Sequence, residues 1–156
     1  MSRASDEWET PESLFNELNA EFGFDLDAAT RRDIGWVDGH WFGPDHSDPY
    51  CRNALAVARW TQFGRVVFLN PPYSQCRAFM AKAAEQARDG CTVVCLVPAR
   101  TDTRWWHEHV WDRETNTWRA GVEGRFLKGR LKFGHATACA PFPSAVIIFR
   151  PSGACQ

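Results

Sequence analysis

The sequence lacks any uninterrupted apolar run long enough to cross a bilayer, so we expect no membrane partner. The opening segment, residues 1–8, also lacks the apolar stretch of a secretory signal, and we therefore expect a cytoplasmic location. Positive charge is not in excess either. The formal net charge is -1 at pH 7, which excludes an overall basic field for nucleic-acid binding. Any contact with a nucleic acid therefore has to come from a local group of basic side chains.

The six cysteines lack the paired spacing that is typical of a zinc site. No Cys-x2-Cys pair occurs, and His107 and His109 stand two residues apart on a predicted helix, where their side chains diverge. Because the chain shows no secretory signal, we interpret the cysteines as reduced thiols. We expect no bound metal.

No repeat, low-complexity tract or linker divides the 156 residues, and this length is typical of one domain. Hydrophobic residues make up 44% of the chain, enough for an ordinary core. Eight Trp and eleven Phe are many for this length, and aromatic rings serve both core packing and base stacking. Composition alone therefore leaves the function class open.

Hydrophobic patterning predicts strands that alternate with helices. The predicted helices cover about Thr10–Phe22, Ser74–Arg88 and Thr101–Val110, the last capped by Thr101 or Asp102. The predicted strands cover Phe24–Ala29, Arg65–Leu69, Cys91–Val97 and Ala145–Phe149, with a strand or hairpin over Arg125–Phe133 around Gly129. Between them lie an irregular segment over residues 31–50 that can hold one short strand, a short helix or turn over 53–60, and a polar loop over 112–121. This alternation predicts a mostly parallel sheet with helices on both faces.

Two of the predicted strands end in polar residues. Asp25 and Asp27 close the first strand, and Asn70-Pro71-Pro72-Tyr73 follows the second. Ligands of parallel sheets bind outside the carboxyl ends of the strands. If the two strands are neighbours, both groups of side chains lie in one crevice.

The motif Asn70-Pro71-Pro72-Tyr73 suits the binding of a primary amino group. Its two prolines fix the backbone and remove N–H donors, so the carbonyl oxygens remain acceptors. The Asn70 amide oxygen and the Pro71 carbonyl match the two hydrogens of an amino group, and Tyr73 offers a flat ring. Holding both hydrogens frees the lone pair of a delocalised nitrogen for direct methyl transfer. The alternative is a plain proline-rich turn, but the flanking strand and helix favour the catalytic interpretation.

The chain resembles the phage-type DNA N6-adenine methyltransferase family, often called phage Dam. The resemblance rests on blocks that keep one order from about residue 8 to 149: Trp8-Glu9-Thr10-Pro11, Phe22–Ala29, Asn53-Ala54-Leu55, Val67–Ser74, Leu96–Thr103, Gly129–Phe133 and Pro141–Ser144. It implies a Rossmann-like class I methyltransferase fold, with a mostly parallel twisted sheet and a C-terminal hairpin. It implies one domain, residues 1–156, without a separate target-recognition domain.

The same resemblance implies the reaction and its partners. S-adenosylmethionine is the expected methyl donor, and double-stranded DNA is the expected partner. A base inside a duplex cannot reach the motif, so the adenine is expected to flip out and stack on Tyr73. The gene is expected to belong to a phage or prophage and to act in the cytoplasm of a bacterial host.

Six residues are assigned to the cofactor by the resemblance: Thr10, Pro11, Asp25, Asp27, Ala28 and Asn53. Thr10 and Pro11 are expected over the methionine end, although Thr10 equally suits a helix cap. Asp27 stands at the position of the acidic residue in the family's cofactor loop, where a carboxylate holds the ammonium group of the cofactor. Asp25 points to the opposite face of a regular strand and is the weaker candidate. Asn53 stands where related enzymes place an Asp near the cofactor adenine, with a helix cap as the equal alternative.

The chain departs from the common pattern of this fold at two points. The loop that begins at Asp27 contains no glycine, whereas methyltransferases often carry a glycine-rich loop there. The acidic partner of the cofactor ribose is also not singled out, because four aspartates qualify: Asp33, Asp38, Asp45 and Asp48.

Arg125, Lys128, Arg130 and Lys132 form a basic group late in the chain. In a strand, Arg130 and Lys132 share one face. We expect this face to contact DNA phosphates, with a solvated strand face as the alternative. Trp105 and Trp106 are expected in the core.

Other functions share parts of this pattern. Enzymes that methylate the amide of protein glutamines use the same four-residue motif, and cytosine-N4 methyltransferases use similar ones. A non-catalytic nucleic-acid-binding remnant is a third alternative, which the intact motif disfavours. The order of all the blocks favours adenine N6.

Overall fold

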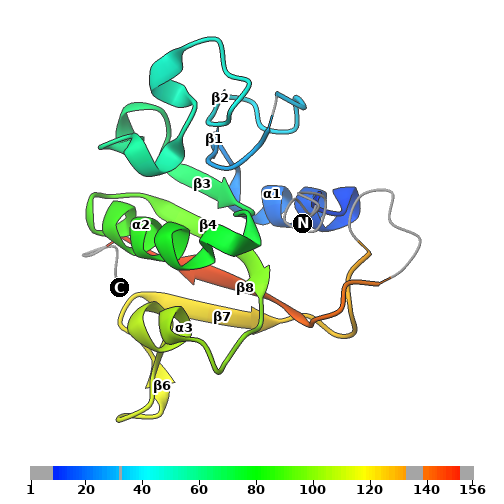
Figure 1. The fold of residues 1–156 in the computed structure, drawn as a ribbon, viewed down its shortest axis with the longest axis vertical. Coiled ribbons are helices and arrows are strands. Elements are labelled where there is room, and N and C mark those ends of the chain that lie inside the picture. The colour runs from blue at the N-terminus through cyan, green and yellow to red at the C-terminus, as the bar shows by residue number, and fades with distance from the viewer. Residues whose placement is uncertain (1–8, 32, 133–138, 152–156) are drawn as a thin grey trace.

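The computed structural model describes residues 9–31, 33–132 and 139–151. Six of its strands form one sheet in the order β2-β1-β3-β4-β8-β7 (Figure 1). Their bounds are β1 Leu26–Asp27, β2 His40–Trp41, β3 Val66–Leu69, β4 Thr92–Pro98, β7 Val122–Phe126 and β8 Ser144–Phe149. Strands β2, β1, β3 and β4 are mutually parallel, and β8 runs antiparallel to both β4 and β7. The mostly parallel α/β sheet expected from the sequence is confirmed.

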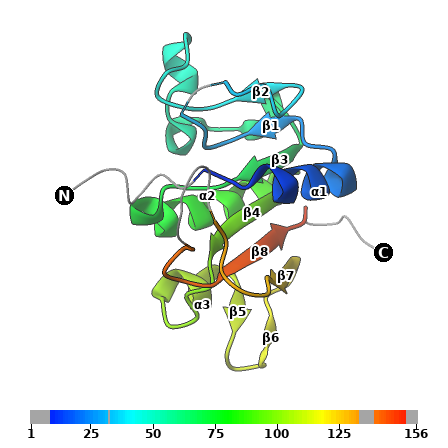
Figure 2. The ribbon, with the colours of Figure 1, turned by 90° about the vertical axis from the view of Figure 1, so that its right-hand side faces the viewer.

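Helices cover both faces of this sheet, as expected. Helix α1 spans Glu12–Phe22, α2 spans Cys76–Arg88 and α3 spans Arg104–His109. Figure 2 shows α1 on one side of the sheet and α2 with α3 on the other. The described residues also contain four single 3-10 turns: Pro49–Cys51, Ala54–Ala56, Trp60–Gln62 and Tyr73–Gln75.

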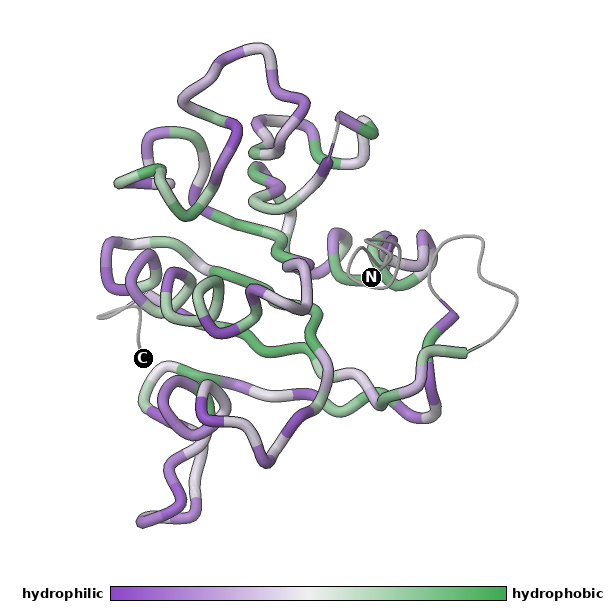
Figure 3. The backbone as a smooth tube through the Cα atoms, viewed as in Figure 1, coloured by the Kyte–Doolittle hydropathy of each residue, from purple (hydrophilic) through white to green (hydrophobic). Residues whose placement is uncertain are grey.

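The core has two layers because successive strand residues point to opposite faces. In β4, Val93 and Cys95 belong to the cluster beneath α2 and α3, whereas Val94 and Leu96 belong to the cluster beneath α1. Apolar residues therefore fill both faces, and Figure 3 shows them concentrated along β3, β4 and β8. A strand that is buried on both faces has a continuous apolar run in its sequence, and for this reason the sequence predicts the bounds of β4 well. Trp105 and Trp106 lie in the first cluster, which confirms their assignment to the core.

Cysteines are dispersed through this core as thiols. Cys51, Cys76, Cys91, Cys95 and Cys139 are free, and the first four are buried. Burial raises the pKa of Cys91 to about 11 and also raises the pKa of Cys95, so both thiols stay protonated at neutral pH. Within the described ranges, no group of three His, Cys, Asp or Glu side chains converges as metal ligands. No helix in the same ranges is long and apolar enough to span a membrane.

Gln86 is a polar side chain that is fully buried in the first layer. Its Oε1 accepts from the Trp60 backbone N–H at 2.8 Å, and its Nε2 donates to the Ala58 carbonyl at 3.0 Å. Trp60 is itself fully buried. Gln86 therefore ties α2 to the segment that precedes β3.

We expect Gln86→Leu to lower the free energy of unfolding by about 2 kcal/mol, because the buried Trp60 N–H loses its acceptor. Equilibrium unfolding in urea measures this change. The matched control is Gln62→Leu, since Gln62 is exposed. Equal urea midpoints for Gln86→Leu and the unchanged protein would contradict the expectation.

Several predicted elements differ in their bounds or type. Helices α1 and α2 each begin two residues later than expected, and β1 covers only Leu26–Asp27 of the predicted Phe24–Ala29. Helix α3 begins at Arg104 rather than Thr101, because residues before it form a turn in which the Thr103 N–H donates to the Arg100 carbonyl at 3.1 Å. The segment 112–121 is not a plain polar loop, since β5 (Trp111–Asp112) and β6 (Thr117–Trp118) pair as a small antiparallel hairpin. Asn116, at φ 57°, makes the turn between them.

The predicted strand or hairpin around Gly129 is also wrong. The strand in this region is β7, which starts three residues before Arg125, pairs with β8 and ends at Phe126. Residues 127–132 form a loop in which Gly129 has φ 73°. Pairing with β8, which is distant in sequence, therefore determines where this strand lies. The prediction for Phe133 falls outside the described residues.

Candidate active site

The motif Asn70-Pro71-Pro72-Tyr73 lies at the carboxyl end of β3, a central strand between β1 and β4. Strand β3 stops at Leu69, where the prolines end the ladder. The Gln75 N–H donates to the Pro72 carbonyl at 3.0 Å, and this turn leads directly into α2. The expected context of strand, turn and helix is therefore present.

Asp27 lies at the same edge, because β1 is the parallel neighbour of β3. The register pairs Asp27 with Phe68, and the Ala28 N–H donates to the Phe68 carbonyl at 3.0 Å. Asn70 thus follows two residues after the partner of Asp27, on a strand that is about 4.8 Å away. Asp27 and Asn70 therefore lie at the same edge of the sheet, whereas Asp25 does not, and the expectation of one shared crevice stays a prediction.

Asp27 is only 7% exposed, which is unusual for an acidic residue. Its pKa is raised to about 7, mainly by burial; a hydrogen bond from the Ala29 N–H at 3.2 Å opposes the rise, and the nearby Asp33 charge adds to it. In the described part of the chain, that amide is the single hydrogen-bond donor to this carboxylate. A buried carboxylate with so little compensation favours a cationic ligand.

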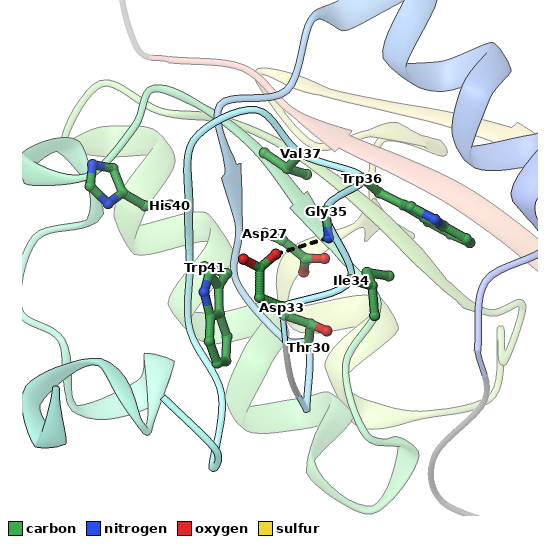
Figure 4. A pocket seen from close by; sticks show the side chains of 9 residues that line it. All are labelled: Asp27, Thr30, Asp33, Ile34, Gly35, Trp36, Val37, His40 and Trp41. Carbon is green, nitrogen blue, oxygen red and sulfur yellow. Dashed lines mark hydrogen bonds between the residues drawn. The ribbon is translucent and has the colours of Figure 1, made fainter. Parts of the chain in front are cut away.

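Asp27 also lines a pocket beside β1 (Figure 4). Thr30 and Asp33 add polar groups to its wall, and Trp36 and Trp41 add aromatic surface. The sequence offered Asp33 only as one of four candidates for the ribose and did not single out Thr30, Trp36 or Trp41, because this segment has no periodicity. The sequence signal for this pocket was the group of aromatic residues that follows the acidic end of the first strand. The motif Asn70-Pro71-Pro72-Tyr73, which follows β3, does not line this pocket.

Of the four aspartates considered for the cofactor ribose, Asp33 is the one that lines this pocket. Its Oδ1 accepts from the Gly35 N–H at 2.9 Å. Asp48 instead caps a 3-10 turn by accepting from the Tyr50 N–H at 3.0 Å, and Asp45 lies 3.9 Å from the Arg31 guanidinium at the surface.

The loop after Asp27 has no glycine of its own, but one lies opposite it. A Cβ on Gly43 would stand 1.5 Å from the Thr30 carbonyl oxygen, so only glycine fits there. The Thr30 N–H also donates to the Phe42 carbonyl at 3.1 Å. The close approach of backbones at this edge therefore depends on a glycine from the segment after β2.

Thr10 joins the motif instead of capping a helix. Helix α1 starts at Glu12 with Pro11 at its cap position and no side-chain cap bond. The Thr10 side chain is buried, and its Oγ1 accepts from Asn70 Nδ2 at 2.9 Å. The helix-cap interpretation of Thr10 is therefore wrong, and the residue lies at the proposed site.

The Tyr73 ring meets the Phe142 ring edge to face, with centroids 5.0 Å apart at 82°. Burial raises the pKa of Tyr73, so the phenol is neutral at physiological pH. Phe142 is itself buried in the second core cluster and holds the Tyr73 ring from that side.

Two of the residues assigned to the cofactor have other roles. Asp25 lies at the amino end of β3, where its Oδ1 accepts from the N–H groups of Arg65 and Val66 at 2.9 and 2.8 Å. Asn53 caps a 3-10 turn by accepting from the Leu55 N–H at 3.0 Å. Neither lines the pocket that contains Asp27, and Thr10, Pro11 and Ala28 do not line it either.

The predicted basic group divides into two parts. Arg125 is committed to ion pairs with Glu21, at 2.6 and 2.7 Å, and with Glu123 at 2.8 Å, which hold its pKa above the ordinary value. Its predicted contact with DNA phosphates is therefore replaced by ion pairs within the chain, at the surface. The three other members, Lys128, Arg130 and Lys132, are exposed on the loop after β7.

This loop leaves the sheet at the edge that carries the motif. The Leu127 N–H donates to the Ser144 carbonyl at 3.2 Å, and Ser144 pairs with Pro98 at the carboxyl end of β4. The loop therefore starts beside the end of β4, which neighbours β3.

The fold and the site together have the features of a Rossmann-like methyltransferase: a sheet with one antiparallel strand near its edge, an acidic end to β1 and Asn-Pro-Pro-Tyr after β3. Comparison with known proteins defines the family. Residues 1–151 match the family described as DNA N-6-adenine-methyltransferase (Dam), and the chain belongs to that family.

A curated relative, the DNA N-6-adenine-methyltransferase of Escherichia phage T1, is 31% identical over 104 residues. The match covers 66% of this chain and 40% of the relative, so the chain spans about two fifths of the length of that protein.

Proposed function

We propose that this chain transfers a methyl group from S-adenosylmethionine to N6 of adenine in double-stranded DNA. The observation that carries the proposal is the meeting of Asn70-Pro71-Pro72-Tyr73 and the buried Asp27 at the carboxyl ends of neighbouring strands. Membership of the DNA N-6-adenine-methyltransferase family supports it. Because the matched relative comes from a phage of Escherichia, we place the reaction in a bacterial cell.

The side chains that line the pocket beside β1 match the chemical groups of this cofactor. Asp27 supplies a buried anion for its ammonium group, and Trp36 with Trp41 supplies apolar surface for its adenosine. Asp33 provides a carboxylate for ribose hydroxyls. When bound, S-adenosylmethionine supplies a methyl group activated by a sulfonium centre.

The protein's contribution is to prepare the amino nitrogen. The Asn70 amide oxygen and the Pro71 carbonyl accept the two N6 hydrogens and draw the nitrogen toward a tetrahedral form. The lone pair then leaves the ring system and becomes available for in-line attack. Both acceptors are fixed before the substrate arrives, since Pro71 is buried and Asn70 is hydrogen-bonded to Thr10.

Tyr73 holds the adenine ring in this arrangement. An extruded base keeps part of its stacking energy when an aromatic face replaces its neighbours. The Phe142 ring fixes Tyr73 from one side, which keeps its orientation constant. The phenol is uncharged, so the ring acts as a stacking surface.

Lys128, Arg130 and Lys132 are proposed to hold the DNA backbone, because they are exposed at the edge that carries the motif. Replacing all three with alanine is expected to make DNA affinity less dependent on salt. The slope of log affinity against log salt concentration should become shallower by about 0.9 for each phosphate that the variant no longer neutralises. Fluorescence anisotropy over a potassium chloride series measures the slope.

Arg125→Ala is the matched control for this experiment. Its ion pairs with Glu21 and Glu123 predict a loss of stability with an unchanged salt slope. A triple variant with the unchanged slope, or an Arg125→Ala variant with a reduced one, would contradict the assignment of the DNA contact.

One assay separates the proposed function from its alternatives. The purified protein is incubated with duplex DNA and tritiated S-adenosylmethionine, and the DNA is digested to nucleosides. We expect the label in N6-methyl-deoxyadenosine. Label in N4-methyl-deoxycytidine, label in protein glutamine, or no transfer at all would support respectively the cytosine enzyme, the glutamine enzyme or the non-catalytic remnant.

A further inference from the structure

The loop between β4 and α3, residues 99–103, lies at the edge of the sheet that carries the motif. Strands β3 and β4 are parallel neighbours, with Leu69 paired to Cys95, and β4 continues to Pro98. The loop therefore leaves the sheet beside the end of β3, where Asn70 follows, and Figure 1 shows both strand ends on the same side of the molecule. An adenine bound at the motif would have this loop as a neighbour.

Hydrogen bonds hold the backbone of this loop around Arg100. The Arg100 N–H donates to the Pro98 carbonyl at 2.8 Å, and the Ala99 N–H donates to the Pro143 carbonyl at 2.9 Å. The Arg100 carbonyl accepts from both the N–H and the hydroxyl of Thr103, at 3.1 and 2.7 Å. The side chain of Arg100 is therefore carried by a backbone that is fixed on both sides.

The loop is also tied to the elements around it. The His107 Nε2–H donates to the Thr101 carbonyl at 2.7 Å, which joins the loop to α3. On the other side, Pro143 follows Phe142, whose ring meets the Tyr73 ring of the motif. The position of the loop is thus linked to the position of the motif.

The Arg100 side chain is exposed. Among the described residues no carboxylate, that of Asp102 in the same loop included, forms an ion pair with its guanidinium. Arg125 differs in this respect, because Glu21 and Glu123 neutralise it. An unpaired guanidinium is a fork of N–H donors with a full positive charge, and its geometry matches a phosphate group.

We propose that Arg100 binds a DNA phosphate next to the extruded adenine. An extruded base stays linked through its sugar to the phosphates before and after it, so these phosphates approach the same edge of the sheet as the base. A cation on a fixed loop at that edge then favours the extruded state. This role rests on the proposed function and is separate from the contacts proposed for Lys128, Arg130 and Lys132.

The first test measures the phosphate contact without methyl transfer. Arg100→Gln removes the charge, and the slope of log DNA affinity against log potassium chloride concentration should become shallower by about 0.9, the value for one phosphate. Arg88→Gln is the matched control, because Arg88 is exposed, has no ion pair among the described residues and ends α2 near the opposite end of β4. An unchanged slope in Arg100→Gln, or an equal change in Arg88→Gln, would overturn the proposal.

The second test locates the phosphate. The adenine that receives the tritium label is mapped in the duplex, and an uncharged methylphosphonate replaces the phosphate before it in one duplex and after it in another. We expect one of these linkages to weaken binding of the unchanged protein at least about fivefold. The same linkage should cost Arg100→Gln nothing further, because both changes remove one contact, whereas Arg88→Gln should respond in full. No response in the unchanged protein, or additive losses in Arg100→Gln, would refute the contact.

The two tests separate this contact from the proposed function. If the unchanged protein transfers no methyl group while Arg100→Gln still has the shallower slope, the proposed function fails and the phosphate contact stands without its link to extrusion. If methyl transfer proceeds and the slope of Arg100→Gln is unchanged, the contact fails and the proposed function stands.

Discussion

Asn70→Ala is expected to reduce kcat for methyl transfer at least about 10³-fold while the affinity for cofactor survives. Removing one preorganised group at a reacting centre costs about 10²- to 10³-fold, and here the amino nitrogen also loses the acceptor that exposes its lone pair. The proposed cofactor pocket lies beside β1 and its lining does not include Asn70, so binding there should be unaffected. Single-turnover transfer and calorimetry with a cofactor analogue measure the two quantities separately.

Tyr73 provides the matched pair of variants for the other half of the motif. Tyr73→Ala removes the stacking surface and is expected to nearly abolish transfer, whereas Tyr73→Phe keeps the ring and should retain most activity. The edge-to-face contact with Phe142 holds either ring in place. Full activity in purified Asn70→Ala would remove Asn70 from the mechanism, and full activity in Tyr73→Ala would do the same for the stack.

Asp27→Ala is expected to weaken cofactor binding at least about tenfold, or about 1.4 kcal/mol, through the loss of a charged hydrogen bond. Asp33→Ala is the control within the same pocket, because Asp33 is exposed and already engaged by the Gly35 N–H. Its effect should be smaller. Calorimetry that shows the same affinity for Asp27→Ala as for the unchanged protein would refute the ammonium contact.

The raised pKa of Asp27 adds a pH dependence to this contact. With a pKa of about 7, the carboxyl group is mostly protonated near pH 5.5 and half ionised near pH 7. Cofactor affinity should therefore rise more than about tenfold over that interval, and Asp27→Asn should flatten the profile. A profile that is the same in both proteins would assign the titration to another group.

The same shift has the opposite effect on stability without cofactor. Because the folded-state pKa is above the unfolded value, the contribution of Asp27 to stability is complete below about pH 4 and is lost as the pH rises through about 7.

Local sequence signals were sufficient to place most of the framework. The apolar runs of β3, β4 and β8 are buried on both faces, so their strands are visible without tertiary information. The prolines after Leu69 end β3 by removing donors, and they fix the edge where the motif lies. Adjacency of β1 and β3 then brings Asp27 to that edge, as parallel topology predicts.

The errors come from contacts between residues that are distant in sequence. Arg125 belongs to a basic group along the chain, but its partner Glu21 lies 104 residues away and neutralises it. Thr10 looks like a helix cap from its neighbours, but its partner is 60 residues away. Local propensity carries no information on either contact.

The central claim is that Asp27 and Asn70 serve one active site from neighbouring strands. A crystal structure of the protein with a non-reactive S-adenosylmethionine analogue tests it most directly. We predict that the amino group of the analogue binds the Asp27 carboxylate and that its methyl-bearing end points toward Asn70. An analogue bound away from Asp27, or one whose reactive end faces away from Asn70, would contradict the claim.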